Sequence, residues 1–384
     1  MKNYQKMQKY IEEKFLKNHQ VMGMDPLGWV EKPDRLKLIT IEPSHFSDGF
    51  EETITKIEFG GFSSCYNLVL LDLSSLCNLK EIESSAFQKS WSLREIKFPP
   101  NLEKISSGSF TDCLKLVKLD LSHLLKMSMI ESDLFKNSWE LQEISFPPNI
   151  EKIGTRSFKN CTNLVRLDLS NCSQLEKIGY DTFVRGWSLR EITFNRNLKK
   201  ILAGAFLECT SLTRLDFSHC DQFEKLGNNV FTDAFSLQEL ILPQTLQKIS
   251  HHAFRNCTSL TRLRIPASVN EIEEEAFSGC TNLEKVVFEN IDGIEIHARA
   301  FQNCPKFARR HRHPGFRYGK YSELKGSLQF GQGSEGGTCG ISLEEFQDDS
   351  DIVVLPCGHA YFEEAFNQWF SMQIICPTCK VALE

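Results

Sequence analysis

The chain has 384 residues, of which 41% are apolar and 24% are charged, and this balance excludes a wholly disordered or collagen-like protein. Its formal charge is -6, from 44 basic and 50 acidic residues, so we do not expect a general nucleic-acid-binding protein. The sequence predicts no membrane span, because it lacks an apolar run of about 18 residues, and no secretory signal. Fourteen Cys without such a signal indicate a reducing compartment, the cytoplasm, with the nucleus as the alternative.

Residues 4–18 are expected to form a helix, because five apolar residues recur there at helical spacing: Tyr4, Met7, Tyr10, Ile11 and Phe15. A helix before a repeat array usually covers the open edge of the first repeat, and binding to a membrane surface is the alternative role. We expect residues 1–50 to form this cap, with an irregular continuation over residues 19–50.

A Phe recurs along the middle of the chain with a mean spacing of 23.9 residues, at positions 62, 87, 110, 135, 158, 183, 206, 231, 254, 277 and 301. Through Phe254 the intervals alternate between 25 and 23 residues, so the unit is a double repeat of 48 residues. Each repeat contains a short segment of alternating apolar residues, such as Leu164, Leu167 and Leu169, which is typical of a strand with one buried face.

The repeat resembles the leucine-rich repeats of the BspA type, whose pattern is seen in Ala253-Phe254, Cys257, Leu260, Leu263 and Ile265-Pro266. This resemblance implies an α/β solenoid with one parallel sheet, which we place at residues 51–307. Its turns are expected to stack at about 4.8 Å, the spacing of neighbouring strands.

Two columns of equivalent positions follow the repeat Phe. Cys occupies the third position after it in seven repeats, as a small buried residue rather than a metal or redox ladder: Cys65, Cys113, Cys161, Cys209, Cys257, Cys280 and Cys304. The next position holds Trp91, Trp139, Trp187 and Phe235 in alternate repeats, and we expect these residues to form a packing column.

The outward strand positions form a column of alternating charge, made by Glu95, Lys118, Glu143, Arg166, Glu191, Arg214, Glu239 and Arg262. Pairing between neighbouring strands explains the alternation, and a docking face for an unknown protein substrate is the functional interpretation. No nucleophile, base and orienting group recur together there, so the repeats contain no predicted catalytic site.

Residues 308–337 are expected to be a flexible basic linker, since residues 305–338 carry seven basic and two acidic side chains and several Gly. The alternative interpretation of the run from Arg309 to His313 is an RNA-binding or nuclear-localisation patch. The absence of interleaved aromatic residues from this run disfavours that interpretation.

Residues 338–384 are similar to a RING-H2 finger, a small α+β domain in which eight ligands hold two zinc ions. The positions are Cys339, Ser342, Cys357, His359, Phe362, Ala365, Cys376 and Cys379. The resemblance implies that the first and third pairs share one zinc and the second and fourth pairs share the other. Cys357, His359, Cys376 and Cys379 therefore form a complete Cys3His set for one Zn(II), whereas Phe362 and Ala365 are expected to replace the other ion with an apolar plug.

The resemblance to RING-type ubiquitin ligases also implies a groove for a ubiquitin-conjugating enzyme, formed here by Ile341, Trp369 and Pro377. In those ligases a basic residue after the last ligand contacts both ubiquitin and the conjugating enzyme, and Lys380 occupies that position. Lys keeps the charge of the usual Arg but lacks its bidentate geometry.

These features predict a ubiquitin ligase without a covalent catalytic residue, in which the repeats bind a protein substrate and the tail positions a conjugating enzyme. The alternative is a non-enzymatic interaction protein with a pseudo-RING scaffold. SUMO ligases are a second relative, because their RING-like domains also keep a single Cys3His zinc, but their spacing between the His and the final Cys pair is longer.

Overall fold

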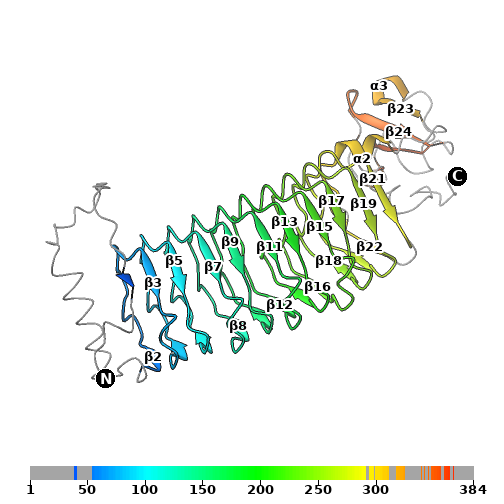
Figure 1. Ribbon diagram of the computed structural model, residues 1–384. Coiled ribbons are helices and arrows are strands. Elements are labelled where there is room, and N and C mark those ends of the chain that lie inside the picture. Colours follow the sequence, from blue (N-terminus) through cyan, green and yellow to red (C-terminus); the bar gives the residue numbers. More distant parts are fainter. Residues whose placement is uncertain are drawn as a thin grey trace, which may run out of the picture.

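In the computed structural model, the described residues are 39–40, 54–290, 294–297, 299–310, 317–324, 339, 341, 345, 347–355, 359–363 and 366. Most of them form an elongated solenoid of stacked turns (Figure 1). No helix in these ranges is long and apolar enough to cross a membrane. The expected helix over residues 4–18 lies outside the described residues.

The wider of the two strand ladders contains β1 (Ile39–Thr40), β3 (Leu70–Asp72), β5 (Glu95–Lys97), β7 (Lys118–Asp120), β9 (Glu143–Ser145), β11 (Arg166–Asp168), β13 (Glu191–Thr193), β15 (Arg214–Asp216), β17 (Glu239–Ile241), β19 (Arg262–Ile265) and β21 (Lys285–Phe288). All pairs in this wide ladder are parallel, in the orders β1-β3-β5, β7-β9, β11-β13-β15-β17 and β19-β21. In β5, β7, β11 and β13 the middle residue is buried and both of its neighbours are exposed, as the alternation predicts. The predicted parallel solenoid is thereby confirmed.

The sequence did not predict a second, narrow ladder of two-residue strands. It contains β2 (Lys56–Ile57), β4 (Glu81–Ile82), β6 (Lys104–Ile105), β8 (Met129–Ile130), β10 (Lys152–Ile153), β12 (Lys177–Ile178), β14 (Lys200–Ile201), β16 (Lys225–Leu226), β18 (Lys248–Ile249), β20 (Glu271–Ile272) and β22 (Glu295–Ile296). These strands also pair in parallel, in the orders β2-β4-β6, β8-β10-β12-β14-β16 and β18-β20-β22. The core of each turn therefore lies between the wide ladder and the narrow ladder.

The recurring Phe forms one continuous stack through the core. Neighbouring rings from Phe62 to Phe301 lie 5.1–5.7 Å apart between centroids, with interplanar angles of 4–16°. Offset stacking of this kind adds about 0.5–1.5 kcal/mol per pair beyond the burial of apolar area. The stack explains why Phe, rather than a mixture of apolar residues, occupies this position in every turn.

From Phe62 to Phe277, residues with positive φ flank each repeat Phe on both sides. Around Phe158 these residues are Arg156, with φ of 55°, and Asn160, with φ of 63°. The side chain of Asn160 donates a hydrogen bond to Asn137 Oδ1 in the preceding turn at 2.7 Å. Asn tolerates positive φ better than most residues, and here its amide also links two neighbouring turns.

Replacing Phe183 with Ala is expected to lower the free energy of unfolding by about 3–5 kcal/mol, because the cavity interrupts stacking with the Phe158 and Phe206 rings. Urea unfolding followed by circular dichroism measures the change. Tyr180→Ala is the control, because that side chain is 52% exposed and its loss should change stability by about 0.5 kcal/mol at most. Equal losses for the two variants would contradict a stabilising Phe stack.

A separate three-stranded antiparallel sheet, in the order β23-β24-β25, lies in the C-terminal part of the chain. It consists of β23 (Arg317–Lys320), β24 (Asp351–Val354) and β25 (Ala360–Phe362). Within the described residues there are two short helices, α2 (Pro305–Arg310), after the last repeat, and α3 (Tyr321–Leu324), directly after β23.

The prediction of a flexible linker over residues 308–337 is wrong for residues 317–324. There β23 pairs with β24, in the register Tyr318 with Val353 and Gly319 with Ile352. The reason is the apolar β24, whose Ile352, Val353 and Val354 are buried and whose second edge would otherwise be open.

Candidate functional site

The alternating charges of the wide ladder pair across neighbouring strands. Lys118 Nζ lies 3.1 Å from Glu143 Oε2, Arg166 Nε lies 3.4 Å from Glu191 Oε2, and Arg214 Nε lies 2.7 Å from Glu239 Oε2. The strand registers place these partners directly opposite each other. Each exposed pair contributes about 0.2–1 kcal/mol, so the column mainly fixes the register and presents a polar surface.

The ends of this charge column differ from its middle. Glu95 Oε1 lies 3.9 Å from Lys97 Nζ of its own strand, and Lys97 also reaches Asp72 Oδ2 at 3.4 Å. At the other end Arg262 lies opposite Lys285 in the register of β19 and β21, so the alternation of sign stops there.

The Cys column is buried and links successive turns. From Cys113 onward each thiol lies within hydrogen-bonding distance of the backbone oxygen of the Phe one turn earlier, as in Cys161 Sγ to Phe135 O at 3.5 Å and Cys209 Sγ to Phe183 O at 3.4 Å. Burial raises the pKa of both Cys161 and Cys209 to about 12. These thiols are therefore protonated packing groups and not nucleophiles.

The buried thiols predict a loss of stability at alkaline pH. An unfolded Cys loses its proton above about pH 8.5, whereas the folded Cys161 keeps its proton until a much higher pH, so the free energy of unfolding falls as pH rises in between. Cys161→Ala should reduce this slope by up to about 1.4 kcal/mol per pH unit, the value for one proton. Urea unfolding at a series of pH values measures it.

Cys77→Ala, which removes an exposed thiol, is the control and should leave the slope of the unaltered protein. An unchanged slope for Cys161→Ala would show that Cys161 is ionised in the folded state.

The neighbouring aromatic column was predicted to be packing, and the structure corrects this. Trp91, Trp139, Trp187 and Phe235 are 40–49% exposed, whereas the Cys residues one position earlier in the adjacent turns from Cys113 to Cys257 are buried. The sequence did contain a signal of this exposure, namely the variation in side-chain volume at the position. Leu114, Thr162 and Thr210 occupy the same position in the intervening turns. A core of constant width does not accommodate Trp in one turn and Thr in the next.

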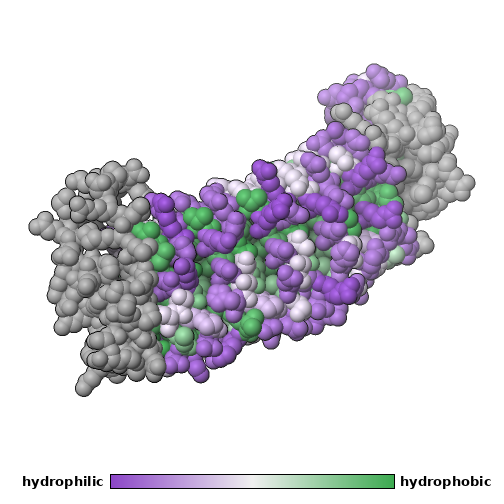
Figure 2. All heavy atoms as spheres, in the orientation of Figure 1, coloured by the Kyte–Doolittle hydropathy of each residue, from purple (hydrophilic) through white to green (hydrophobic). Residues whose placement is uncertain are grey.

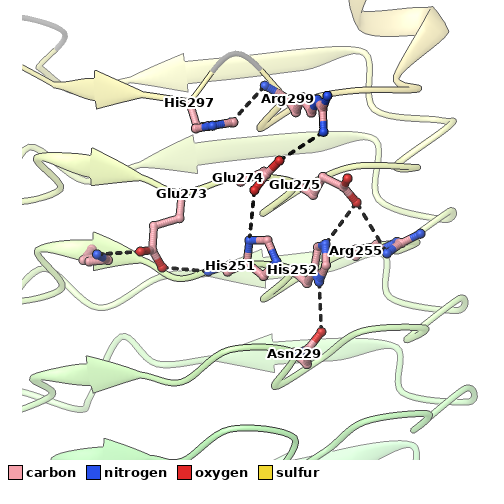
Figure 3. A network of polar contacts seen from close by, with 10 residues as sticks. Asn229, His251, His252, Arg255, Glu273, Glu274, Glu275, His297 and Arg299 are labelled. Atoms are coloured by element: carbon pink, nitrogen blue, oxygen red, sulfur yellow. Dashed lines mark hydrogen bonds and ion pairs between the residues drawn. The ribbon is translucent and has the colours of Figure 1, made fainter.

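A polar cluster near the C-terminal end of the solenoid joins four consecutive turns (Figure 3). His252 Nε2 lies 3.0 Å from Glu275 Oε2, and its Nδ1 lies 3.2 Å from Asn229 Oδ1. Arg299 reaches Glu274 Oε1 at 3.2 Å. Burial and the neighbouring His251 lower the pKa of His252. The cluster pairs charges between turns and presents no nucleophile.

In the C-terminal sheet, the two described positions of the predicted first zinc site lie together. Cys339 is fully buried, and its Sγ accepts a hydrogen bond from the backbone N–H of Phe362 at 3.4 Å. Phe362 and Ile341 pack against a small core that contains Cys339, Val354 and Tyr361. Ser342 and Ala365 lie outside the described residues. Cys339 and Phe362, one residue from the first and one from the third pair of predicted ligand positions, thus lie side by side.

Of the predicted zinc ligands, only His359 lies within the described residues, where its carbonyl oxygen accepts a hydrogen bond from Leu355 N–H at 3.0 Å. Cys357, Cys376 and Cys379 lie outside them, as do Trp369, Pro377 and Lys380. In the described part of the chain no three His, Cys, Asp or Glu side chains form a metal-binding group. Three thiols and an imidazole are nonetheless a donor set that structural Zn(II) takes, so these four residues would hold it.

The family described as BspA type leucine rich repeat region matches residues 37–138, 128–232 and 224–312. The chain belongs to this family. The leucine-rich repeats therefore extend over the whole solenoid. A second family, described as Ring finger domain, matches residues 337–380 at the C-terminal end of the repeats.

Three curated proteins are similar to this RING segment. The E3 ubiquitin ligase BIG BROTHER-related of Arabidopsis thaliana is 38% identical over 11% of this chain and 12% of its own length. The RING-H2 finger protein ATL34 of the same plant is 38% identical over 16% of this chain and 19% of its own. RING finger protein 122 of Homo sapiens is 36% identical over 12% and 28%. The chain thus spans less than a third of each of these relatives.

Among solved structures, a leucine rich cell surface protein from Faecalibacterium prausnitzii is 19% identical, with a TM-score of 0.42 over 66% of this chain and 76% of that chain. A leucine rich repeat protein of T. pallidum is 28% identical, with a TM-score of 0.38 over 42% and 72%.

Proposed function

We propose that this protein is a ubiquitin ligase in which the repeats bind a protein substrate and the RING segment positions a charged conjugating enzyme. The observation that carries the proposal is the match of residues 337–380 to a RING finger, shared with curated ubiquitin ligases. The packing of Cys339, Ile341 and Phe362 on one core supports it, because a finger that keeps its core can keep its docking surface.

The ligase would act by positioning and not by covalent chemistry. Ile341, Trp369 and Pro377 would form the groove for the conjugating enzyme, and Lys380 would contact both that enzyme and its ubiquitin. Holding the thioester in a reactive conformation converts an encounter between molecules into a step within one complex, which lowers its entropic cost. Lys380 offers a single charge where Arg would offer two parallel hydrogen bonds. The contact made by Lys380 would therefore be weaker than the contact that Arg makes at this position.

We propose one zinc ion per chain, held by Cys357, His359, Cys376 and Cys379, which fixes the loops that carry the groove. Cys339 is not expected to bind a second ion. One thiolate cannot hold a structural zinc ion, and the other three positions of its ligand set hold Ser342, Phe362 and Ala365. Elemental analysis of metal-replete protein should give one equivalent of zinc, and two equivalents would overturn the apolar plug.

The wide-ladder face is proposed to bind the substrate, since leucine-rich-repeat solenoids present a long regular surface to partners. The free thiols of the described residues suit a reducing compartment, and we propose the cytoplasm.

The second candidate is a non-enzymatic scaffold, favoured by the loss of three ligand positions in the first zinc site. An auto-ubiquitination assay over a panel of conjugating enzymes separates the two functions. Transfer by the unaltered protein, abolished by Trp369→Ala, supports the ligase. Absence of transfer with every conjugating enzyme would leave the scaffold.

A further inference from the structure

We propose that two copies of this chain associate through β21, the last strand of the wide ladder. The open edge of β21 pairs in antiparallel orientation with the same edge of the second copy. The dimer does not depend on the proposed function. Its consequence does rest on the proposed function, because the substrate-binding faces of both copies would then lie in one continuous sheet.

The wide ladder ends at β21 because the next turn supplies no strand to continue it. On one side β21 pairs with β19. Lys285 begins β21, whereas the equivalent residue of the next turn, Arg309, lies in the helix α2. Within the described residues, no strand pairs with the second edge of β21 (Figure 1). A strand edge of this kind is a template for pairing with another chain.

The backbone polar groups of Val286 and Phe288 point to this open edge. The N–H of Glu289 donates to Ile265 O of the preceding turn at 3.0 Å. Successive residues of a strand direct their N–H and C=O groups to alternate sides, so Val286 and Phe288 face away from β19. In the described part of the chain, no hydrogen bond reaches the N–H or C=O of either residue. Both donors and both acceptors are therefore available to a second strand.

The side chains of Val286 and Phe288 are only half-buried, although they pack against the solenoid core. Their equivalents in β19, Leu263 and Ile265, are 3% and 0% exposed, because a further turn covers them. Figure 2 shows hydrophobic residues that reach the surface at the C-terminal end of the solenoid, among mainly hydrophilic side chains. A strand laid along this edge would remove that apolar area from water.

Antiparallel pairing of β21 with itself is complementary in one register. About a two-fold axis at Val287, Lys285 lies opposite Glu289 of the second copy. In the same register Val286 lies opposite Phe288 of the second copy, and each of these pairs exchanges both backbone hydrogen bonds. A shift of two residues in either direction sets Val287 opposite Lys285 or Glu289, and the charge pairs are lost.

The charges of β21 favour a second copy over an unrelated strand. Lys285 lies opposite Arg262 in the register of β19 and β21, and within the described ranges it forms no ion pair. Glu289 of the second copy would supply the carboxylate that the alternating column lacks at this end. The Glu289 carboxylate already accepts Arg264 Nη1 at 3.3 Å, and its two oxygens have capacity for a further donor.

The two-fold axis would join the wide ladders of both copies. Lys285, Val287 and Glu289 point outward in each copy, because the pairing keeps the residues of one face on one side of the sheet. Such a contact is isologous and closes at a dimer. A substrate with two binding segments would be held by both copies, and its second contact would form within one complex.

Sedimentation velocity of the full, zinc-replete chain over about 1–200 µM tests the proposal, because a small contact of this kind is expected to have a dissociation constant of about 10–100 µM. Val287→Lys should raise that constant at least tenfold, since it places two like charges opposite each other at the axis. Val165→Lys is the matched control. Val165 is 39% exposed and Val287 is 37% exposed, but Val165 lies several turns from β21, so the control should keep the dimer.

Exchanging the charged pair identifies the register. Lys285→Glu and Glu289→Lys should each dissociate the dimer, because each variant sets like charges opposite each other. An equimolar mixture of the two variants should restore a dimer with one copy of each, since both charge pairs are then complementary. Thermal unfolding shows that each variant keeps the fold, as expected for exposed side chains.

Four results would overturn the proposal. They are a monomer at every concentration, a dimer that persists in Val287→Lys, no association in the mixture, and assemblies that grow beyond a dimer. Growth beyond a dimer would indicate contact between opposite ends of the solenoid. Auto-ubiquitination is measured separately. A dimer that transfers no ubiquitin would retain this inference and lose the proposed function, whereas transfer by a protein that stays monomeric would do the reverse.

Discussion

Replacing Cys376 with Ser is expected to release the zinc ion and to unfold the C-terminal sheet while the solenoid remains folded. Structural zinc contributes an apparent binding free energy of about 10–16 kcal/mol in small fingers, and the core around Val354 and Tyr361 is too small to replace it. Solenoid stability comes from neighbouring turns, so the main thermal transition should persist. Zinc content by elemental analysis and thermal unfolding by circular dichroism measure the two effects.

Cys339→Ser is the matched control, because it changes the same type of residue within the same finger. Cys339 is proposed to accept the Phe362 N–H and not to hold zinc, so this variant should keep one equivalent. Loss of zinc from Cys339→Ser, or its retention in Cys376→Ser, would show that the ligand set is assigned incorrectly.

Ile341→Ala is expected to reduce ubiquitin transfer at least tenfold without loss of zinc. A groove residue that contacts a partner carries binding energy of this order when it lies at the centre of the contact. Ile341 is half-buried and packs against the core, so the variant should also lose some stability. Single-turnover transfer from a charged conjugating enzyme measures the first effect, and thermal unfolding measures the second.

Leu324→Ala separates these two effects. Leu324, from α3, packs against the same core but lies outside the proposed groove. The variant should lose comparable stability and retain transfer. Equal loss of transfer in both variants would mean that Ile341 acts only through the fold, and the proposed docking groove would then be abandoned.

The repeat fold was predictable from the sequence because the signals for each turn are local. Phe at a spacing of 23.9 residues and alternating apolar residues such as Leu167 and Leu169 define one turn, and every turn buries the same face against the next. The ligand spacing of the RING segment is equally local, because pairs such as Cys376 and Cys379 lie only a few residues apart.

The narrow ladder and β23 were not predictable in the same way. Strands of two residues, such as Lys177–Ile178, are too short to show a period. The strand Arg317–Lys320 has no apolar alternation and forms because β24, more than thirty residues later in the chain, offers an open edge.

The sequence by itself determined that this chain is a solenoid of leucine-rich repeats followed by a segment that matches a RING finger. Only the tertiary structure decided which of two adjacent positions in each turn faces the solvent. Cys161 points into the core and Trp187, one position further in its own turn, does not, although both side chains are apolar. The reason is geometric, because adjacent residues direct their side chains to different sides of the backbone, and the stacked turns bury only one of those sides.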